Sequence, residues 1–373
     1  MLSITITDHQ DSEDCLFLNI WQPKNTTKLT SSSSLLPVMV WIHGGAFQSG
    51  TIFSTIYDGQ HLAHQGQVIV VSIAYRLGPL GFLYFARDNH HHPLVPGNLG
   101  LHDQILALKW IQNNIINFGG DPTKVTIFGE SAGSMSVGAL LLSPLLITSQ
   151  SEGRRLFHRA IMQSGAPIGR LFIQSPSEHL KVTKTFARKL DCFPIGKDYS
   201  YGDNNDDYDK VMIDCLTYNR TVERMQQVWF DAFTNGHYFN LIYGDEILPQ
   251  NPAELLLEEA QNKRTSTSEI NNNNNNNRTI MLEPVDLMFG VTGDEGSTFV
   301  AKILPYFNDE KHQPPMTLPS SYYEMINVMT YYDGYYDRKF AQKVAEYYSS
   351  MLYKKRKYDH HHYDHQPSQN ELK

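Results

Sequence analysis

Short, nearly continuous runs of apolar residues recur along the chain and predict buried β-strands. The runs are rich in β-branched residues and do not alternate with polar ones, which is typical of parallel strands covered on both faces. They are Val38–Ile42, Val68–Ala74, Val125–Phe128, Ala160–Met162 and, much later in the chain, Leu287–Val291. The pattern therefore predicts a sheet of parallel strands.

An amphipathic helix is predicted over Leu101–Asn117, between the second and third of these runs. Its apolar residues recur at steps of three and four and fall on one face; they are Leu101, Ile105, Leu108, Ile111 and Ile115. We expect Gly119-Gly120 to end this helix and Asp121-Pro122 to turn the chain into the next strand. Strand, helix and strand in this order indicate a right-handed parallel crossover, and hence an α/β architecture.

Polar stretches without periodicity interrupt this pattern and predict surface insertions. Tyr199–Asp209 is rich in Asp, Asn and Tyr, and Gln261–Thr279 contains seven consecutive Asn. Neither segment can bury enough apolar surface to pack a core, so both are expected to be disordered. The chain becomes basic and then rich in His and Asp over Lys354–Lys373. We expect a disordered tail there, which leaves residues 1–353 as one domain.

Composition allows a large core and excludes two kinds of partner. Hydrophobic residues make up 41% of the 373, enough to bury a sizeable core. A net charge of -8 provides no basic field, so no nucleic-acid partner is expected. The longest apolar runs, such as Leu35–Ile42 and Val137–Leu142, are far shorter than the ~20 residues that span a bilayer. No membrane span is therefore expected in this chain.

Other sequence signals are missing from the chain. Met1–Gln10 has neither the basic n-region nor the apolar h-region of a secretory signal peptide. The sequence contains no spaced Cys/His zinc pattern and no glycine loop of the kind that binds phosphate. We therefore predict no metal site and no cofactor.

The strongest chemical signal is Gly129-Glu130-Ser131-Ala132-Gly133, a G-x-S-x-G motif. A predicted strand precedes it and a stretch suited to a helix, Ala132–Leu142, follows it, which is the context of a nucleophile elbow. The glycines let the backbone turn sharply and hold the serine hydroxyl exposed. The N-terminus of the helix directs its N–H groups at a developing oxyanion. On this motif alone, a turn of small residues without catalytic role is the alternative.

A second motif, His43-Gly44-Gly45-Ala46-Phe47, directly follows the predicted strand Val38–Ile42. In α/β-hydrolases a loop at this position supplies further N–H groups to the oxyanion hole. Small residues are needed there because the backbone itself must approach the substrate oxygen closely. Two independent motifs in the expected order favour the catalytic interpretation over a structural turn.

Longer phrases of the sequence resemble one family. Phe118–Gly133, which reads FGGDPTKVTIFGESAG, resembles the active-site signature of the type-B carboxylesterase and cholinesterase family. Glu13–Pro23, EDCLFLNIWQP, resembles its second signature, with Phe17 where Tyr is more usual. The phrases NLGLHDQILALKWIQNNI and LFHRAIMQSGA fit the same family. The resemblance implies an α/β-hydrolase fold, with a mostly parallel central sheet and helices on both of its faces.

The resemblance also assigns roles to residues by position. It implies that Ser131 is the acylated nucleophile and that Glu295, within the phrase Gly290–Phe299, is the acid of the triad. Nucleophile and acid in this order fit α/β-hydrolases, whereas Glu295 taken alone would be a solvated loop carboxylate. The other residues with implied roles are the oxyanion-hole donors Gly45, Ala46 and Ala132 and the supporting residues Glu130 and Ser164.

The family's catalytic histidine has no match in this chain. The resemblance places it in a G-x-x-H-G-x-E segment well beyond the acid, and none of the sixteen histidines has that setting. We therefore expect the N- and C-terminal parts of the fold to be missing here. Removing the histidine of a comparable triad costs on the order of 10⁶ in turnover. The 373 residues alone are thus expected to hydrolyse esters barely or not at all.

Cysteines and glycosylation sequons bear on the compartment. The resemblance implies a disulfide between Cys192 and Cys215, and it places the partner of Cys15 earlier in the chain, where no cysteine occurs. Cys15 is therefore expected to be unpaired. The sequons begin at Asn25, Asn219 and Asn277. Together with the family's habit, these features favour a secreted or luminal protein.

Three interpretations of function stay open. The first is a hydrolase of small-molecule carboxylic esters that acts through a serine acyl-enzyme. The second is a catalytically inactive adhesion or binding ectodomain, and the third is a chain that never folds stably because missing strands expose its sheet edges. Cholinesterases carry a tryptophan shortly before the cysteine that matches Cys15, and Met1–Asp14 holds no Phe, Trp or Tyr. Choline esters are therefore not the expected substrates, and the acyl-pocket region around Trp229–Phe239 is too diverged to assign.

Overall fold

The computed structural model describes residues 12–24, 35–86, 93–146, 155–168, 172–192, 206–234, 239–265 and 285–292. The chain divides into two compact units, residues 1–291 and 292–373, and the described residues other than Thr292 belong to the first. Four of the sequence predictions lie outside the described residues: Glu295, Asn25, Asn277 and the tail Lys354–Lys373. The fold below is that of the first unit.

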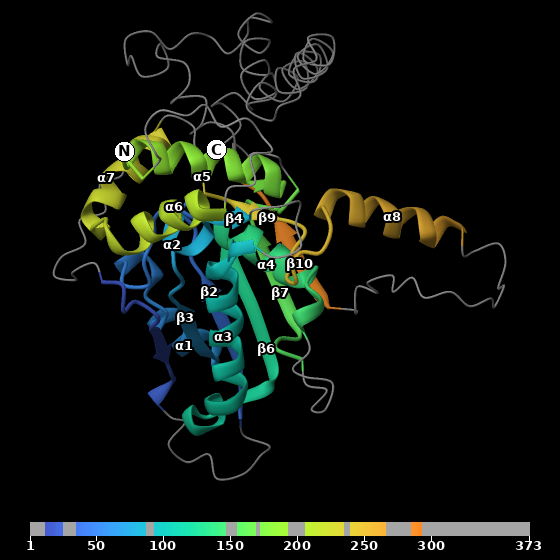
Figure 1. Ribbon diagram of the computed structural model, residues 1–373. Helices are drawn as coiled ribbons and strands as arrows, with labels where there is room; N and C mark the ends of the chain where they lie inside the picture. The colour runs from blue at the N-terminus through green and yellow to red at the C-terminus, as the bar shows by residue number, and fades with distance from the viewer. Residues whose placement is uncertain are drawn as a thin grey trace, which may run out of the picture. The chain divides into compact units, whose positions relative to one another are not determined.

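A six-stranded, mostly parallel sheet forms the centre of the described residues (Figure 1). Its strand order is β1-β3-β2-β6-β7-β10. Strand β1 pairs antiparallel with β3, and the other neighbours pair in parallel. The strands are β1 Leu18–Trp21, β2 Leu36–Ile42, β3 Ile69–Ile73, β6 Gly120–Glu130, β7 Arg159–Gln163 and β10 Asp286–Gly290. The mostly parallel sheet with its helices confirms the predicted α/β architecture and is consistent with the α/β-hydrolase fold that the family resemblance implied.

Burial differs from strand to strand across this sheet. All five residues of β3 are buried, as expected for a strand covered on both faces. Strands β2 and β7 instead alternate buried with less buried residues, and β10 is exposed at every position. Strand β10 ends the strand order among the described residues, and such an edge position has fewer neighbours to cover it. The continuous apolar runs therefore marked strands correctly but overstated how deeply the outer ones are buried.

The predicted crossover helix is present as α3, Leu99–Asn114, which runs alongside the sheet (Figure 1). The α-helix stops before the predicted end, because a 3-10 turn, η4 (Ile115–Phe118), follows it. Gly119 then adopts φ 77° and donates its N–H to the carbonyls of Ile115 and Ile116, which terminates the helical segment. The five apolar residues predicted to share one face are all buried: Leu101, Ile105, Leu108, Ile111 and Ile115.

Strand β6 begins earlier than predicted, so Asp121 and Pro122, which were expected to form a turn, lie within the strand. Its pairing with β2 is irregular at this point, since Leu36 pairs with Gly120 whereas Val38 pairs with Val125. Proline cannot donate a ladder hydrogen bond, so it is tolerated in a strand where the pairing is interrupted. The prediction of a turn was therefore wrong, and an irregular pairing takes its place.

Further elements surround the sheet. Helices α5, α6 and α7 gather at one end of it (Figure 1). The small sheets are β4–β5, which is antiparallel, and β8–β9, which is parallel. The bounds are η3 Thr55–Tyr57, α1 Gln60–Gly66, α2 Gly78–Phe82, β4 Tyr84–Ala86, β5 Pro93–Pro96, α4 Ala132–Leu141, η5 Pro144–Leu146, β8 Ile173–Gln174, α5 Pro176–Lys189, α6 Asp206–Tyr218, α7 Val222–Thr234, β9 Leu241–Ile242 and α8 Pro252–Thr265.

Two of these helices correct the predicted insertions. Helix α6 begins at Asp206, inside Tyr199–Asp209, and α8 continues to Thr265, inside Gln261–Thr279. Acidic residues are favoured in the first turn of a helix, and Gln and Lys are good helix formers. The prediction of disorder, which was made from composition, took neither of these helix signals into account. The remaining parts of the two segments lie outside the described residues.

A disulfide joins Cys192, which follows α5, to Cys215 of α6, and it closes a loop with a sequence separation of 23. This is the pairing that the family resemblance implied. The Arg220 guanidinium donates hydrogen bonds to the carbonyls of Leu190 and Asp191 beside the disulfide. Cys15 is a free, half-buried cysteine, and burial raises the pKa of its thiol.

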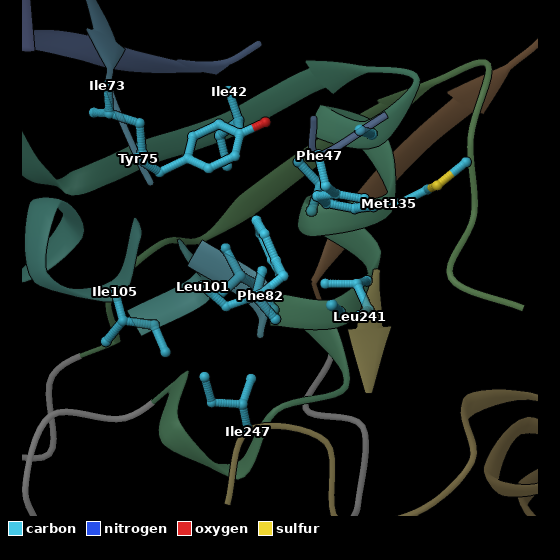
Figure 2. Close-up of a cluster of buried hydrophobic side chains, with 14 of the residues drawn as sticks. Ile42, Phe47, Ile73, Tyr75, Phe82, Leu101, Ile105, Met135, Leu241 and Ile247 are labelled. Atoms are coloured by element: carbon cyan, nitrogen blue, oxygen red, sulfur yellow. The ribbon is translucent and has the colours of Figure 1, made fainter. Parts of the chain in front are cut away.

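The hydrophobic core connects the ends of the strands to the surrounding helices. Figure 2 shows Phe47, Phe82 and Met135 among its buried side chains. The rings of Phe47 and Phe82 lie 5.0 Å apart between centroids. Because Phe47 follows the end of β2, the core anchors the loop that the sequence analysis assigned to the oxyanion hole.

Candidate active site

Ser131 lies in a sharp turn between β6 and α4, as the nucleophile elbow requires. Its φ of 56° and ψ of -121° are sparsely populated by residues other than glycine. Hydrogen bonds hold both sides of the turn, because Ser131 N–H donates to the Gln163 carbonyl over 2.9 Å and Met135 N–H donates to the Ser131 carbonyl over 2.9 Å. The strained serine is therefore fixed by main-chain contacts.

Glycine is required on both sides of the serine because other backbone atoms pack against the turn. A Cβ atom at Gly129 would lie 2.5 Å from the carbonyl carbon of Gly133. One at Gly133 would lie 2.0 Å from the carbonyl oxygen of Ile42, at the end of β2. These distances leave no room for a side chain, and they place the elbow against the strand that carries the second motif.

The loop that follows β2 is also strained. Three consecutive residues have positive φ, with 117° at Gly45, 56° at Ala46 and 62° at Phe47. A Cβ atom at Gly44 would lie 2.7 Å from the Glu130 carbonyl oxygen and 3.2 Å from Ser131 Cβ. The loop therefore lies directly beside the serine, and the two motifs of the sequence form one site.

The backbone N–H groups predicted to bind an oxyanion are available in this arrangement. Among the described residues, the N–H groups of Gly45, Ala46 and Ala132 donate no hydrogen bond. Ala132 is also the first residue of α4, where the helix dipole gives the N–H groups a partial positive charge. Such groups, fixed beside a nucleophile, can stabilise negative charge on an oxygen.

The supporting residues predicted from the sequence flank the elbow. The Glu130 carboxylate lies beside Gly44, where a Cβ atom would be 2.9 Å from its Oε2. Burial and, second, the charge of Glu130 raise the pKa of Tyr57. Ser164, at the end of β7, has a φ of 53° and donates its N–H to the Gly290 carbonyl over 2.9 Å. The ends of β7 and β10 thus meet next to the elbow.

Glu295 itself lies outside the described residues, five positions after Gly290. The hydrogen bond between Ser164 and Gly290 brings the start of the phrase Gly290–Phe299 to the side of the elbow. The role of Glu295 stays a prediction, since its side chain is not described.

Comparison with known proteins identifies the family. A model described as "Carboxylesterase family" matches residues 2–370. The chain belongs to the carboxylesterase family. It is 36% identical over 303 residues to an acetylcholinesterase from Bungarus fasciatus, a match that covers 80% of the chain and 42% of the relative. An acetylcholinesterase from Electrophorus electricus is 36% identical over 302 residues, which cover 80% and 40%.

A bacterial relative matches a shorter part of the chain at higher identity. The para-nitrobenzyl esterase of Bacillus subtilis (strain 168) is 50% identical over 167 residues, which cover 44% of this carboxylesterase-family chain and 31% of the relative. The chain spans about two fifths of the length of the acetylcholinesterases that it matches and about a third of the bacterial esterase.

Among its described residues, this member of the carboxylesterase family brings no histidine into hydrogen-bonding contact with Ser131. His43 is buried and stacked on Tyr75, with ring centroids 4.4 Å apart, and its Nδ1 lies 2.9 Å from the Gly44 carbonyl oxygen. Burial lowers the pKa of His43 to about 4, so the ring is neutral near pH 7. His43 therefore serves as a structural part of the loop.

The described residues also hold no metal centre and no membrane span. No group of three or more His, Cys, Asp or Glu side chains in the described ranges could bind a metal ion. No helix in these ranges combines the length and the apolar character needed to cross a bilayer.

Two residues at this loop, Gln48 within it and Trp229 against it, carried no signal of their contact in the sequence. The Trp229 Nε1–H donates to Gln48 Oε1 over 2.7 Å, although the two residues are 181 positions apart. A tryptophan in a region too diverged to align carried no signal of this contact. Only the tertiary structure brings the two residues together.

Proposed function

We propose that this member of the carboxylesterase family is a carboxylic ester hydrolase that acts through an acyl-enzyme on Ser131. The observation that carries the proposal is the contact between the elbow and the loop after β2, where a Cβ at Gly44 would meet Ser131 Cβ at 3.2 Å. A strained serine, packed against a loop whose Gly45 and Ala46 N–H groups donate no hydrogen bond within the described part of the chain, supports acyl transfer at this site.

In the proposed reaction, Ser131 Oγ attacks the carbonyl carbon of the ester while a general base removes its proton. The negative charge that develops on the carbonyl oxygen is stabilised by the N–H groups of Gly45, Ala46 and Ala132. The alcohol leaves after receiving that proton, and water then hydrolyses the acyl-enzyme by the same route. Glu130 and Ser164 support the elbow from either side.

The acid and the base of the triad belong to the proposal. Glu295 is the proposed acid. The hydrogen bond between Ser164 and Gly290 supports this role, because Gly290 begins the phrase that contains Glu295 and lies beside the elbow. The proposed base is a histidine of a G-x-x-H-G-x-E segment, which is absent from the 373 residues. The acid would orient the histidine and stabilise its protonated form.

The proposed substrates are small carboxylic esters without a choline group, because Met1–Asp14 holds no Phe, Trp or Tyr for a quaternary ammonium ion. The proposed compartment is secretory or extracellular. The Cys192–Cys215 disulfide supports it, since disulfides persist in oxidising compartments. The exposed Asn219, within one of the sequons, is compatible with glycosylation there.

The proposal is tested by sequencing the transcript through both ends of the reading frame and assaying its product with p-nitrophenyl butyrate. We expect a G-x-x-H-G-x-E segment, and hydrolysis that is lost in Ser131→Ala. The 373 residues alone are expected to show almost no turnover, because a serine hydroxyl without a base is a poor nucleophile. A stop codon directly after Lys373, or a full-length product that leaves the ester intact, would overturn the proposal in favour of a binding ectodomain. Rapid burst hydrolysis by the 373 residues would instead contradict the absence of a base.

A further inference from the structure

The loop after β2 has to be held in place by contacts from outside itself. Ala46 and Phe47 both adopt the left-handed conformation, which residues other than glycine rarely take. Two such residues in succession persist only where surrounding contacts determine the backbone. The Phe47 ring is buried in the core (Figure 2). Its carbonyl accepts the Gly78 N–H over 2.7 Å. Further contacts from other parts of the chain reach the loop through the side chain of Gln48, the next residue.

Gln48 connects the loop to a distant part of the chain. Its side chain is buried, and its Nε2 donates to the Ala46 carbonyl over 3.2 Å and to the Phe239 carbonyl over 2.6 Å. Its Oε1 accepts the indole N–H of Trp229 over 2.7 Å. The amide is thus satisfied at both ends, and it links the Ala46–Phe47 peptide to two segments that follow it by more than 180 residues.

Trp229 of α7 contacts the loop by a second route. A Cβ atom at Gly78 would lie 2.1 Å from Cε2 and Cζ2 of Trp229, so the indole ring lies directly on the Gly78 backbone. Gly78 in turn donates the hydrogen bond to the Phe47 carbonyl. Trp229 therefore reaches both left-handed residues of the loop, through the Gln48 amide to Ala46 and through Gly78 to Phe47.

We propose that Trp229, acting through Gln48, is a positioning residue that fixes the N–H groups of Gly45 and Ala46 for oxyanion binding. The inference rests on the proposed ester hydrolysis at Ser131. The hydrogen bond is the specific element, because Gln48 is the residue that touches both the Ala46 carbonyl and the indole N–H. A displacement of catalytic groups by a fraction of an ångström is costly in acyl transfer, since the donors must meet the oxygen of the transition state.

The test uses Trp229→Phe, which keeps an aromatic side chain on α7 and removes the indole N–H together with part of the ring system. In the full-length product of the transcript, we expect kcat for p-nitrophenyl butyrate to fall about tenfold with KM unchanged. Affinity for a trifluoromethyl ketone, which forms an oxyanion on the serine, should fall by the same factor. Trp110→Phe, at a partly exposed position on α3, is the matched control and should change neither quantity.

A double substitution checks the route through Gln48. Gln48→Leu is expected to lower kcat at least as much as Trp229→Phe, and Trp229→Phe should add no further loss in the Gln48→Leu background. Additive losses would overturn the proposed route. Normal kcat and ketone affinity in Trp229→Phe, with only a lower Tm, would reduce Trp229 to a packing role and overturn the inference.

Hydrogen exchange separates a failure of this inference from a failure of the proposed function. In the 373-residue chain, the peptide that contains residues 44–50 should exchange faster in Trp229→Phe than in Trp110→Phe. An inactive wild-type full-length product would refute the proposed function, while faster exchange would still support the positioning contact. Exchange equal to that of the control would refute the contact, whether or not the enzyme is active.

Discussion

The two halves of the candidate site are strained in the same way but supported differently. Both the elbow after β6 and the loop after β2 place residues other than glycine at positive φ, with 56° at Ser131 and 56° at Ala46. The elbow is held by Gly129, Gly133 and the carbonyl of Gln163, which lie close in sequence or in the next strand. The loop has turn hydrogen bonds of its own, from the Gln48 and Ser49 N–H groups to the Gly45 carbonyl, and in addition it contacts partners 181 and 191 positions away through the Gln48 amide.

This difference shows how strain can be encoded locally or by the tertiary fold. The elbow needs little more than glycines at fixed spacing and neighbouring parallel strands, so the G-x-S-x-G motif alone predicts the turn. The loop needs a glutamine amide matched to a tryptophan on α7 and to the Phe239 carbonyl. Changes at Trp229 or Phe239 should therefore reach the N–H groups proposed to bind the oxyanion and leave the geometry of the proposed nucleophile intact.

The largest expected effect comes from removing the nucleophile. Ser131→Ala in the full-length product should lower the rate of ester hydrolysis on the order of 10⁶-fold, because no other group takes over the covalent step. The measurement is turnover of p-nitrophenyl butyrate, with the Tm as a control for folding. Turnover close to that of the wild type would show that Ser131 is not the nucleophile.

Disturbing the local support of the elbow should cost stability. Gly133→Ala places a Cβ 2.0 Å from the backbone oxygen of Ile42, and backbone cannot move aside cheaply. We expect a loss of about 4 kcal/mol in the free energy of unfolding, measured by urea denaturation. Gly66→Ala is the matched control, since its Cβ would meet a Val68 side-chain carbon at 3.4 Å, an ordinary contact. Equal losses in the two variants would mean that the close packing of the elbow carries no energetic weight.

Acid should weaken the loop more than the elbow, because the loop contains the buried His43. Burial lowers its pKa from 6.5 to about 4 in the folded chain. The neutral ring therefore contributes its full stability above pH 6.5, and this stability is lost as the pH falls from 6.5 through 4. The loss should reach roughly 3 kcal/mol at pH 4.

Urea titrations of the wild type and of His43→Gln between pH 7 and pH 4 measure this contribution. The variant should lose less stability over this range than the wild type. His179→Gln serves as the comparison outside the loop, because burial lowers the pKa of His179 to about 4 as well. Identical slopes in the wild type and in His43→Gln would contradict the assignment to His43.

The smallest expected effect concerns one side-chain hydrogen bond behind the elbow. The buried Ser134 hydroxyl donates to the Gly165 carbonyl over 2.6 Å, beside the carbonyl of Ser131. Ser134→Ala should cost about 1 kcal/mol in the free energy of unfolding. Thr185→Ala removes an exposed hydroxyl that bonds within α5 and should cost almost nothing. A Ser134→Ala variant as stable as this control would show that the bond contributes little.

Patterns of residues close in sequence predicted most of the sheet and the elbow. Contacts between residues far apart in sequence could not be predicted. The apolar runs marked β2, β3, β6, β7 and β10, and G-x-S-x-G marked Ser131 at the junction of β6 and α4. Strand β1 was not predicted, because its four residues, Leu18–Trp21, are only partly buried and form too short an apolar run. The irregular pairing at Pro122 was not predicted, because proline normally indicates a turn.

Side-chain partners were the hardest features to predict. The resemblance to a family supplied the pairing of Cys192 with Cys215, which spacing alone could not have given. It supplied no partner for Gln48, because nothing in the sequence around residue 48 specifies an indole 181 positions later. Tertiary contacts of this kind follow from the fold as a whole.

The disulfide has a consequence for how this protein can be altered. Its Cα atoms are 5.5 Å apart, and they tie Cys192, just after α5, to Cys215, near the C-terminal end of α6. Lengthening a closed loop costs little, about 0.6 kcal/mol for each doubling. A change in the length of the chain between Cys192 and Cys215 should therefore cost little stability as long as the disulfide is formed.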